Sequence, residues 1–144
     1  MRQALLVTSH WKEQDYNSAL TFLKTNDFKI DCTEQNLDEL KEFLVSRRNF
    51  LVGLLENQNL LEHEAFTDLL WAVFHLVEEL DARAVLSGLP QSDTDHLNGD
   101  IKRVFGHISR EWVLYMQHLK QDYPYLFSLA VRMNPMIENP SAAV

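Results

Sequence analysis

The sequence predicts an all-helical protein, a single-domain antiparallel bundle of four to five helices, and three observations support this. Apolar residues recur at spacings of three and four along most of the chain, which places them on one face of a helix. Only four glycines and four prolines occur, too few for the many turns of a β-sandwich or barrel. The 144 residues, 46% of them hydrophobic, suffice for one core. We expect one domain over residues 1–136 and a flexible C-terminal tail over 137–144.

Five helices are expected, joined by short loops. Their ranges are 9–24, 31–56 with Asp31 or Thr33 as N-cap, 61–83, 93–121, and 125–132 after Pro124 at the first helical position. Arg47 interrupts the apolar stripe of the second helix, and we expect its stem to lie along the core. Gly99 and Gly106 lie in the fourth helix, where they either permit a close contact or are tolerated. The fifth helix is apolar nearly all round and is expected to be buried or to cover a groove.

Charge and cysteine content exclude several classes of function. The formal net charge is −8, with 13 basic against 21 acidic residues, so the chain lacks the basic surface of a nucleic-acid binder. One cysteine, Cys32, excludes an internal disulfide framework and a multi-cysteine zinc site, and it fits a reducing cytoplasmic compartment. The longest apolar stretches, 69–77 and 123–131, are shorter than the ~20 residues that span a bilayer. We expect a cytoplasmic protein that is not embedded in a membrane.

A stripe of histidines and acids on the fourth helix is the strongest candidate for a binding site. It lies in a narrow sector beside the apolar arc and consists of His96, Asp100, His107, Glu111 and His118. Polar groups at the edge of a helical interface are partly desolvated and therefore need partners. The third helix offers His75 and Glu79 as further candidates.

Two pairs, His75/Glu79 and His107/Glu111, have i,i+4 spacing, which places both side chains on one helix face. On facing helices they would form a cage of two histidines and two carboxylates, which suits iron, zinc or manganese. However, the Glu-x-x-His pattern of ferritin-like proteins and the His-x-x-x-His pair of hemerythrin-like proteins do not occur. The helical wheel also places His75 opposite the core arc. We therefore expect ordinary surface pairs and no metal or other cofactor; if a metal binds, these four residues are its predicted ligands.

Trp71 lies on the acidic side of the third helix, where it is either an interface anchor or covered by the first or last helix. No nucleophile elbow and no Gly-rich phosphate loop occurs, so no catalytic residue is assigned and the protein is expected not to be an enzyme. Acid–base catalysis by His107 and Glu111 is the lowest-ranked alternative.

Three stretches carry a resemblance to a known domain: LLENQNLLEHE at 54–64, FTDLLWAVFHL at 66–76 and YPYLFSLA at 123–130. Together they resemble a helical domain of unassigned function in bacteria and methanogenic archaea, over roughly residues 35–136. Some members of that group are attached to a potassium-channel-like pore segment, which this sequence lacks. The resemblance implies a cytosolic accessory or regulatory module and supplies no catalytic residues.

Two functional hypotheses follow from these observations. The first is a non-enzymatic interaction or regulatory module that acts through a protein partner or self-association, docking to a membrane protein included. The alternative is a metal- or small-ligand-binding bundle that uses the His/carboxylate stripe. Convergence of these side chains across two helices would favour the alternative.

Overall fold

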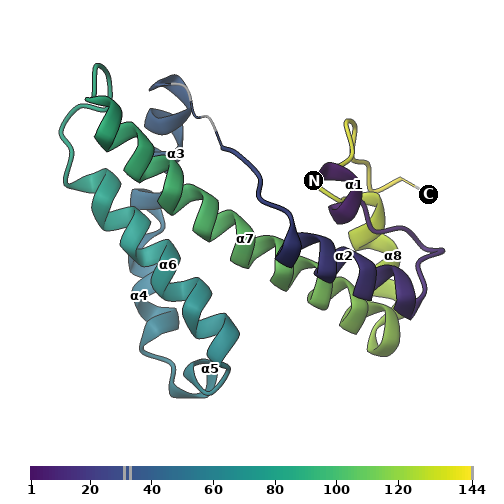
Figure 1. Ribbon diagram of the computed structural model, residues 1–144. Coiled ribbons are helices and arrows are strands. Elements are labelled where there is room, and N and C mark those ends of the chain that lie inside the picture. Colours follow the sequence, from purple (N-terminus) through teal and green to yellow (C-terminus); the bar gives the residue numbers. More distant parts are fainter. Residues whose placement is uncertain (31, 33, 144) are drawn as a thin grey trace. The chain divides into compact units, whose positions relative to one another are not determined.

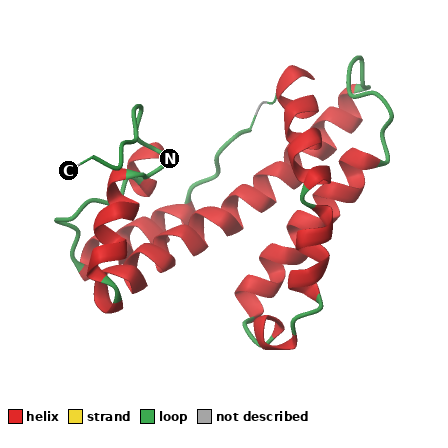
Figure 2. Cartoon of the chain, turned by 180° about the vertical axis from the view of Figure 1, so that it is seen from behind, coloured by secondary structure: helices red, strands yellow, loops and turns green. Residues whose placement is uncertain are grey.

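The computed structural model describes residues 1–30, 32 and 34–143, and in these residues it contains helices and no strand (Figures 1 and 2). The helices are α1 (Arg2–Leu5), α2 (Glu13–Thr25), α3 (Glu34–Ser46), α4 (Arg48–Leu55), α5 (Gln58–Leu61), α6 (Glu64–Asp81), α7 (Gln91–Asp122) and α8 (Pro124–Arg132). The all-helical class is confirmed, whereas the expected number of four to five helices is too low. The N-cap predicted at Asp31 or Thr33 lies outside the described residues.

The chain packs as two compact units, which are described separately. One consists of Lys29–His107 and the other of residues 1–28 together with the chain from Ile108 onward. The long helix α7 contributes residues to both. The domain boundaries predicted from the sequence, 1–136 and 137–144, stay predictions.

Helix α6 is the centre of the Lys29–His107 unit. It contacts α3, α4 and α5, and its apolar stripe forms most of the core of this unit. Its buried residues are Leu69, Leu70, Ala72, Val73, Leu76, Val77 and Leu80. Leu97 and Val104 of α7 belong to the same core, so α6 and the first half of α7 pack side by side, as both views show (Figures 1 and 2). This packing was expected from the 3-4 spacing of apolar residues.

The second predicted helix is broken at Arg47, which corrects the expectation of one helix over 31–56. The Arg47 amide donates to the Leu44 carbonyl, a 3₁₀-type bond, and α4 starts at the next residue. The Arg47 side chain is exposed and its guanidinium lies 5.7 Å from the centre of the Phe43 ring. Its stem therefore does not line the core, and Phe43 and Phe50, which are 57% and 65% exposed, point to solvent.

A short helix, α5, lies at Gln58–Leu61, where a break between helices was expected, and the next helix begins at Glu64 instead of the predicted residue 61. The Asn57 side chain caps α5 by accepting a hydrogen bond from the Asn59 amide at 3.1 Å. Helix α6 then begins at Glu64, whose negative charge suits the first turn.

The other unit has its own core around α2, α8 and the second half of α7. Buried residues there include Leu5, Val7, Tyr16, Ala19, Val113, Met116, Leu119 and Phe127. Asn134 is fully buried: its amide donates to the Leu5 carbonyl at 3.0 Å and its side-chain oxygen accepts from the Met136 amide at 2.9 Å. These bonds hold the N-terminal residues against the segment after α8.

Helix α8 begins at Pro124, as predicted; of the two expectations, burial is wrong, and covering a groove stays a prediction. Only Phe127 of α8 is buried, and Tyr125, Leu126 and Leu129 are 91%, 54% and 41% exposed. Among the described residues, no helix is both long and apolar enough to cross a membrane.

Candidate metal centre

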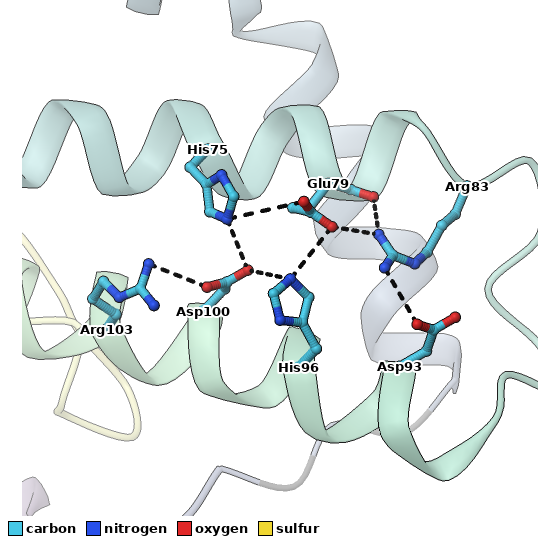
Figure 3. A network of polar contacts seen from close by, with 7 residues as sticks. All are labelled: His75, Glu79, Arg83, Asp93, His96, Asp100 and Arg103. Atoms are coloured by element: carbon cyan, nitrogen blue, oxygen red, sulfur yellow. Dashed lines mark hydrogen bonds and ion pairs between the residues drawn. The ribbon is translucent and has the colours of Figure 1, made fainter.

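Two i,i+4 pairs on neighbouring helices face each other in the Lys29–His107 unit. Helix α6 contributes His75 and Glu79, and α7 contributes His96 and Asp100 (Figure 3). Residues four apart lie on one helix face about one turn from each other, so each helix presents one imidazole and one carboxylate. Asp100 Oδ2 lies 3.2 Å from His75 Nε2 and 3.3 Å from His96 Nε2. Glu79 lies on the opposite side, with Oε2 3.5 Å from His96 Nε2 and Oε1 4.0 Å from His75 Nε2.

These separations match those of atoms that share one metal ion. A tetrahedral ion with bonds of about 2.0–2.2 Å holds its ligand atoms roughly 3.3–3.6 Å apart. Ligand atoms of His75, Glu79 and His96 all lie within 4.8 Å of one another. Asp100 is not a member of this set of three, but its Oδ2 lies within 3.3 Å of both ring nitrogens and would add a second carboxylate oxygen.

Asp100 is the buried member of the cluster. Its side chain is 3% exposed, and Oδ2 accepts no hydrogen bond of good geometry from any described residue, although two ring nitrogens lie within 3.3 Å. A buried carboxylate oxygen without a well-aligned donor is costly, because the lost hydration is not replaced. A cation bound by this oxygen and by the two imidazoles would compensate for the lost hydration.

Two arginines bind these carboxylates, Arg83 at Glu79 Oε2, which is also the oxygen nearest His96, and Arg103 at Asp100 Oδ1, away from the imidazoles. Arg83 Nη1 donates to Glu79 Oε2 at 2.8 Å, and its Nη2 lies 3.6 Å from Asp93 Oδ1. Arg103 Nη1 lies 3.2 Å from Asp100 Oδ1. The hydrogen bond from Arg83 lowers the pKa of Glu79, and the same bond raises the pKa of Arg83. Glu79 is therefore ionised and oriented, as a metal-binding carboxylate must be.

The two imidazoles are open to solvent on one side. The side chains of His75 and His96 are 46% and 49% exposed, and their ring centroids are 6.4 Å apart with the planes at 89°. A metal ion held here would have the buried Asp100 beneath it and water above it. A tetrahedral ion held by all four side chains would be closed, whereas an ion that takes five or six ligands would keep a solvent-facing position for an exchangeable one.

The structure brings together four of the eight residues singled out from the sequence, but not the four predicted as a metal set. His75 and Glu79 belong to the cluster, while His107 and Glu111 do not take part in it. Glu111 pairs with Arg110 at 2.5 Å. His75 is exposed, in agreement with the helical wheel, and its Nε2 nevertheless reaches Asp100 of α7.

The remaining two candidates lie outside the cluster. His118 pairs with Asp122 at 2.8 Å and its ring contacts that of Tyr123. Trp71 is 56% exposed within the described residues and packs edge-on against Phe74, and its role as an interface anchor or its cover by the first or last helix stays a prediction.

One signal in the sequence would have identified the correct pairs. Residues equidistant from the turn of an antiparallel helix pair face each other. The turn lies at Ser87-Gly88, and both His75/Asp100 and Glu79/His96 are symmetric about it. Two residues outside the candidate set, Arg83 and Arg103, support the carboxylates from one helical turn away.

Fold and cluster together define an all-helical domain with a candidate His/carboxylate metal centre. Residues 1–132 match the family described as "Uncharacterized protein MJ1433, C-terminal helical domain", and the chain belongs to this family. It is 45% identical over 135 residues to "Uncharacterized protein MJ1433" of Methanocaldococcus jannaschii. This alignment covers 94% of the chain and 55% of that protein, so the chain spans about half the length of its relative. No solved structure matches significantly. The resemblance to a helical domain found in methanogens is confirmed.

Proposed function

We propose that this domain binds one divalent transition-metal ion through His75, Glu79, His96 and Asp100. The observation that carries the proposal is the buried Asp100 oxygen, which lies within 3.3 Å of two imidazole nitrogens and has no well-aligned hydrogen-bond donor. Two imidazoles and two carboxylates suit zinc, iron(II) or manganese better than calcium or magnesium, which prefer oxygen ligands alone. The proposal reverses the order of the two hypotheses drawn from the sequence.

A network of protonated histidines is the competing explanation. It accounts poorly for the arrangement, because ion pairs of half-exposed groups contribute only about 0–1 kcal/mol. Burying the Asp100 carboxylate costs more than such pairs return unless its oxygens are fully hydrogen-bonded. Arg103 satisfies Oδ1 only. A metal ion satisfies Oδ2 and both imidazoles at once, and so explains why these groups converge.

Metal content after dialysis tests this function. The purified protein is dialysed against zinc, manganese or iron(II) under anaerobic conditions, and bound metal is measured by inductively coupled plasma mass spectrometry. We expect one ion per chain for at least one of these metals. The His75→Ala/His96→Ala variant should lose it.

A matched control is available on the same helix. His107→Ala/Glu111→Ala removes an equivalent i,i+4 pair outside the cluster. This variant should retain the full metal content. Equal loss in both double variants, or no metal in the native protein, would refute the proposed site.

Self-association is the second candidate function, and the apolar face of α8 favours it. Tyr125, Leu126, Leu129 and Met133 are 91%, 54%, 41% and 45% exposed. Their spacing places Tyr125, Leu129 and Met133 on one face of the helix, with Leu126 beside it. We propose a second copy of the chain as the occupant. These four side chains carry no charge, so contacts between them in two copies bring no like charges together, although the chain has a net charge of −8 and Arg132 borders the face.

Sedimentation equilibrium at increasing protein concentration tests the second candidate. The native chain should dimerise, and Leu126→Glu/Leu129→Glu should be monomeric. The control is Phe50→Glu, which adds a charge at an exposed aromatic residue of the other unit. A monomeric native chain at all concentrations refutes self-association and leaves the metal proposal intact. A regulatory role beside a potassium-channel-like pore, and a cytoplasmic location, stay predictions.

A further inference from the structure

The charge balance around the four ligands bears on what else the centre binds. The cluster contains three carboxylates and two guanidinium groups, which form ion pairs. Arg83 pairs with Glu79 and Asp93, and Arg103 pairs with Asp100. With neutral imidazoles this cluster has one net negative charge. A bound divalent ion changes it to one net positive charge, in a position that the half-exposed imidazoles leave open to solvent.

Arg103 has N–H donors left over for a further ligand of the centre. It lies one turn after Asp100 on α7 and is 57% exposed, and its contact with Asp100 uses Nη1 only. The guanidinium group has five N–H donors in a planar fork, which suits the bidentate binding of an oxyanion. Arg83 differs in this respect, since its side chain is 19% exposed and it contacts both Glu79 and Asp93.

We propose that the metal centre takes a small oxyanion as its exchangeable ligand, with one anion oxygen on the metal and Arg103 binding another. This inference rests on the proposed metal-binding function. The ligand chemistry is that of a phosphate or a carboxylate group. A metal that takes a fifth or sixth ligand supplies a positive charge and a coordination position for the anion, and Arg103 supplies charge-assisted hydrogen bonds, which are about twice as strong as those between neutral groups. Asp100 connects the metal position and Arg103, because its Oδ2 faces the metal position and its Oδ1 orients Arg103.

Cobalt(II) is the probe for the test, because its visible spectrum changes with the number and type of its ligands. The protein is first titrated with cobalt chloride, which measures metal binding by itself. Sodium phosphate and, in a separate arm, sodium acetate are then added to the cobalt-loaded protein. We expect a saturable spectral change with at least one anion, and the arm with the lower dissociation constant distinguishes phosphate from carboxylate.

The Arg103→Gln variant tests the role of the guanidinium group. It should bind cobalt more weakly than the native protein, because Arg103 orients the Asp100 carboxylate, and the cobalt-loaded variant should bind the anion about tenfold or more weakly than the cobalt-loaded native protein. Arg103→Lys keeps the positive charge but lacks the planar guanidinium group. Its affinity for the anion should lie between those of the native protein and Arg103→Gln. Arg110→Gln is the control, since Arg110 lies on the same helix and pairs with Glu111 outside the cluster. Circular dichroism confirms that each variant is folded.

The outcomes separate this inference from the function on which it rests. If cobalt does not bind, the proposed metal site is wrong and the inference falls with it. If cobalt binds and neither anion changes the spectrum, the metal site stands and the oxyanion ligand is refuted. If the anion binds equally well to the native protein and to Arg103→Gln, the assigned role of Arg103 is refuted.

Discussion

Asp100 is the residue on which the candidate centre depends most. Its carboxylate is almost completely buried, yet the groups around Oδ2 are two half-exposed imidazoles. In a metal-free protein the neighbours of this oxygen give it little electrostatic stabilisation. In a metal-bound protein it is the ligand best shielded from water, where electrostatic attraction to a cation is strongest.

Asp100→Asn separates these two situations, because it removes the charge and keeps the shape. We expect the variant to bind metal at least tenfold more weakly than the native protein in a zinc titration. The free energy of unfolding of the metal-free form should fall by less than about 1 kcal/mol, or should rise, because a poorly compensated buried charge is lost. Asp95→Asn, an exposed neighbour on α7, is the control for both measurements. A loss of several kcal/mol in the metal-free form would instead identify Asp100 as a structural ion-pair partner.

Tyr16 presents a second buried polar group. It is 2% exposed, and its hydroxyl has no hydrogen-bond partner among the described residues. Burial raises the pKa of Tyr16, and the negative charge of Asp15 adds to this effect. The unfolded chain therefore loses the proton first, so the contribution of Tyr16 to stability is complete below about pH 10 and falls as the pH rises toward the pKa of the folded state.

Tyr16→Phe should consequently leave the unfolding free energy at pH 7 unchanged or slightly higher. Chemical denaturation at pH 7 and in the alkaline range measures both effects. The alkaline loss of stability should be smaller in the variant. A variant much less stable at pH 7 would show that the hydroxyl has a partner in solution.

At the residue scale, the sequence identified all four members of the cluster as candidates but paired them wrongly. Helical periodicity shows which residues share a face, and it placed His96 and Asp100 together correctly. It does not show which residues of two helices meet, because that depends on the register of the turn between them. His107/Glu111 was preferred to His96/Asp100 only because its pattern repeats that of His75/Glu79.

At the scale of elements, the helices themselves were largely predictable and their interruptions were not. The apolar stripes of α6 and α7 follow a 3.6-residue period, which fits an α-helix and not a β-strand. The break at Arg47 leaves this period intact, since the apolar spacing continues into α4, and so it leaves no trace in the pattern. The exposure of α8 was missed because apolar composition was taken to imply burial, whereas an interface can have the same composition.

The glycines of the α6–α7 hairpin allow a matched pair of substitutions. Gly88, in the turn, has φ of +68°, a conformation that disfavours other residues, whereas Gly99 lies inside α7 and an added Cβ would meet no atom within 4 Å. We expect Gly88→Ala to lower the free energy of unfolding by about 1 kcal/mol. Gly99→Ala should raise it by about 0.5–1 kcal/mol, because alanine favours the helix. Urea denaturation measures both, and effects of the same sign would contradict the assigned turn and helix.

At the scale of the whole molecule, all four proposed ligands lie in the Lys29–His107 unit. A ligand that binds only the folded form stabilises it by about 2.7 kcal/mol at a concentration 100 times its dissociation constant. We expect this stabilisation to act on the unit that holds the ligands. The two units have similar amino-acid compositions. The sequence therefore did not indicate where one core ends and the other begins.

Hydrogen–deuterium exchange with and without saturating zinc tests this expectation. Backbone amides in residues 64–81 and 91–107 should exchange more slowly, by up to about a hundredfold for those that exchange only on unfolding of the unit. Amides of α2, in the other unit, should change little. An equal slowing in α2 would show that the two units unfold together.

Anomalous X-ray diffraction from crystals grown with zinc, collected on both sides of the zinc absorption edge, tests the metal centre most directly. Our account predicts one strong anomalous peak between α6 and α7, about 2.0–2.2 Å from His75 Nε2, His96 Nε2 and one oxygen each of Glu79 and Asp100. A peak elsewhere, for example beside His118 and Asp122, or no peak in this unit, would contradict it.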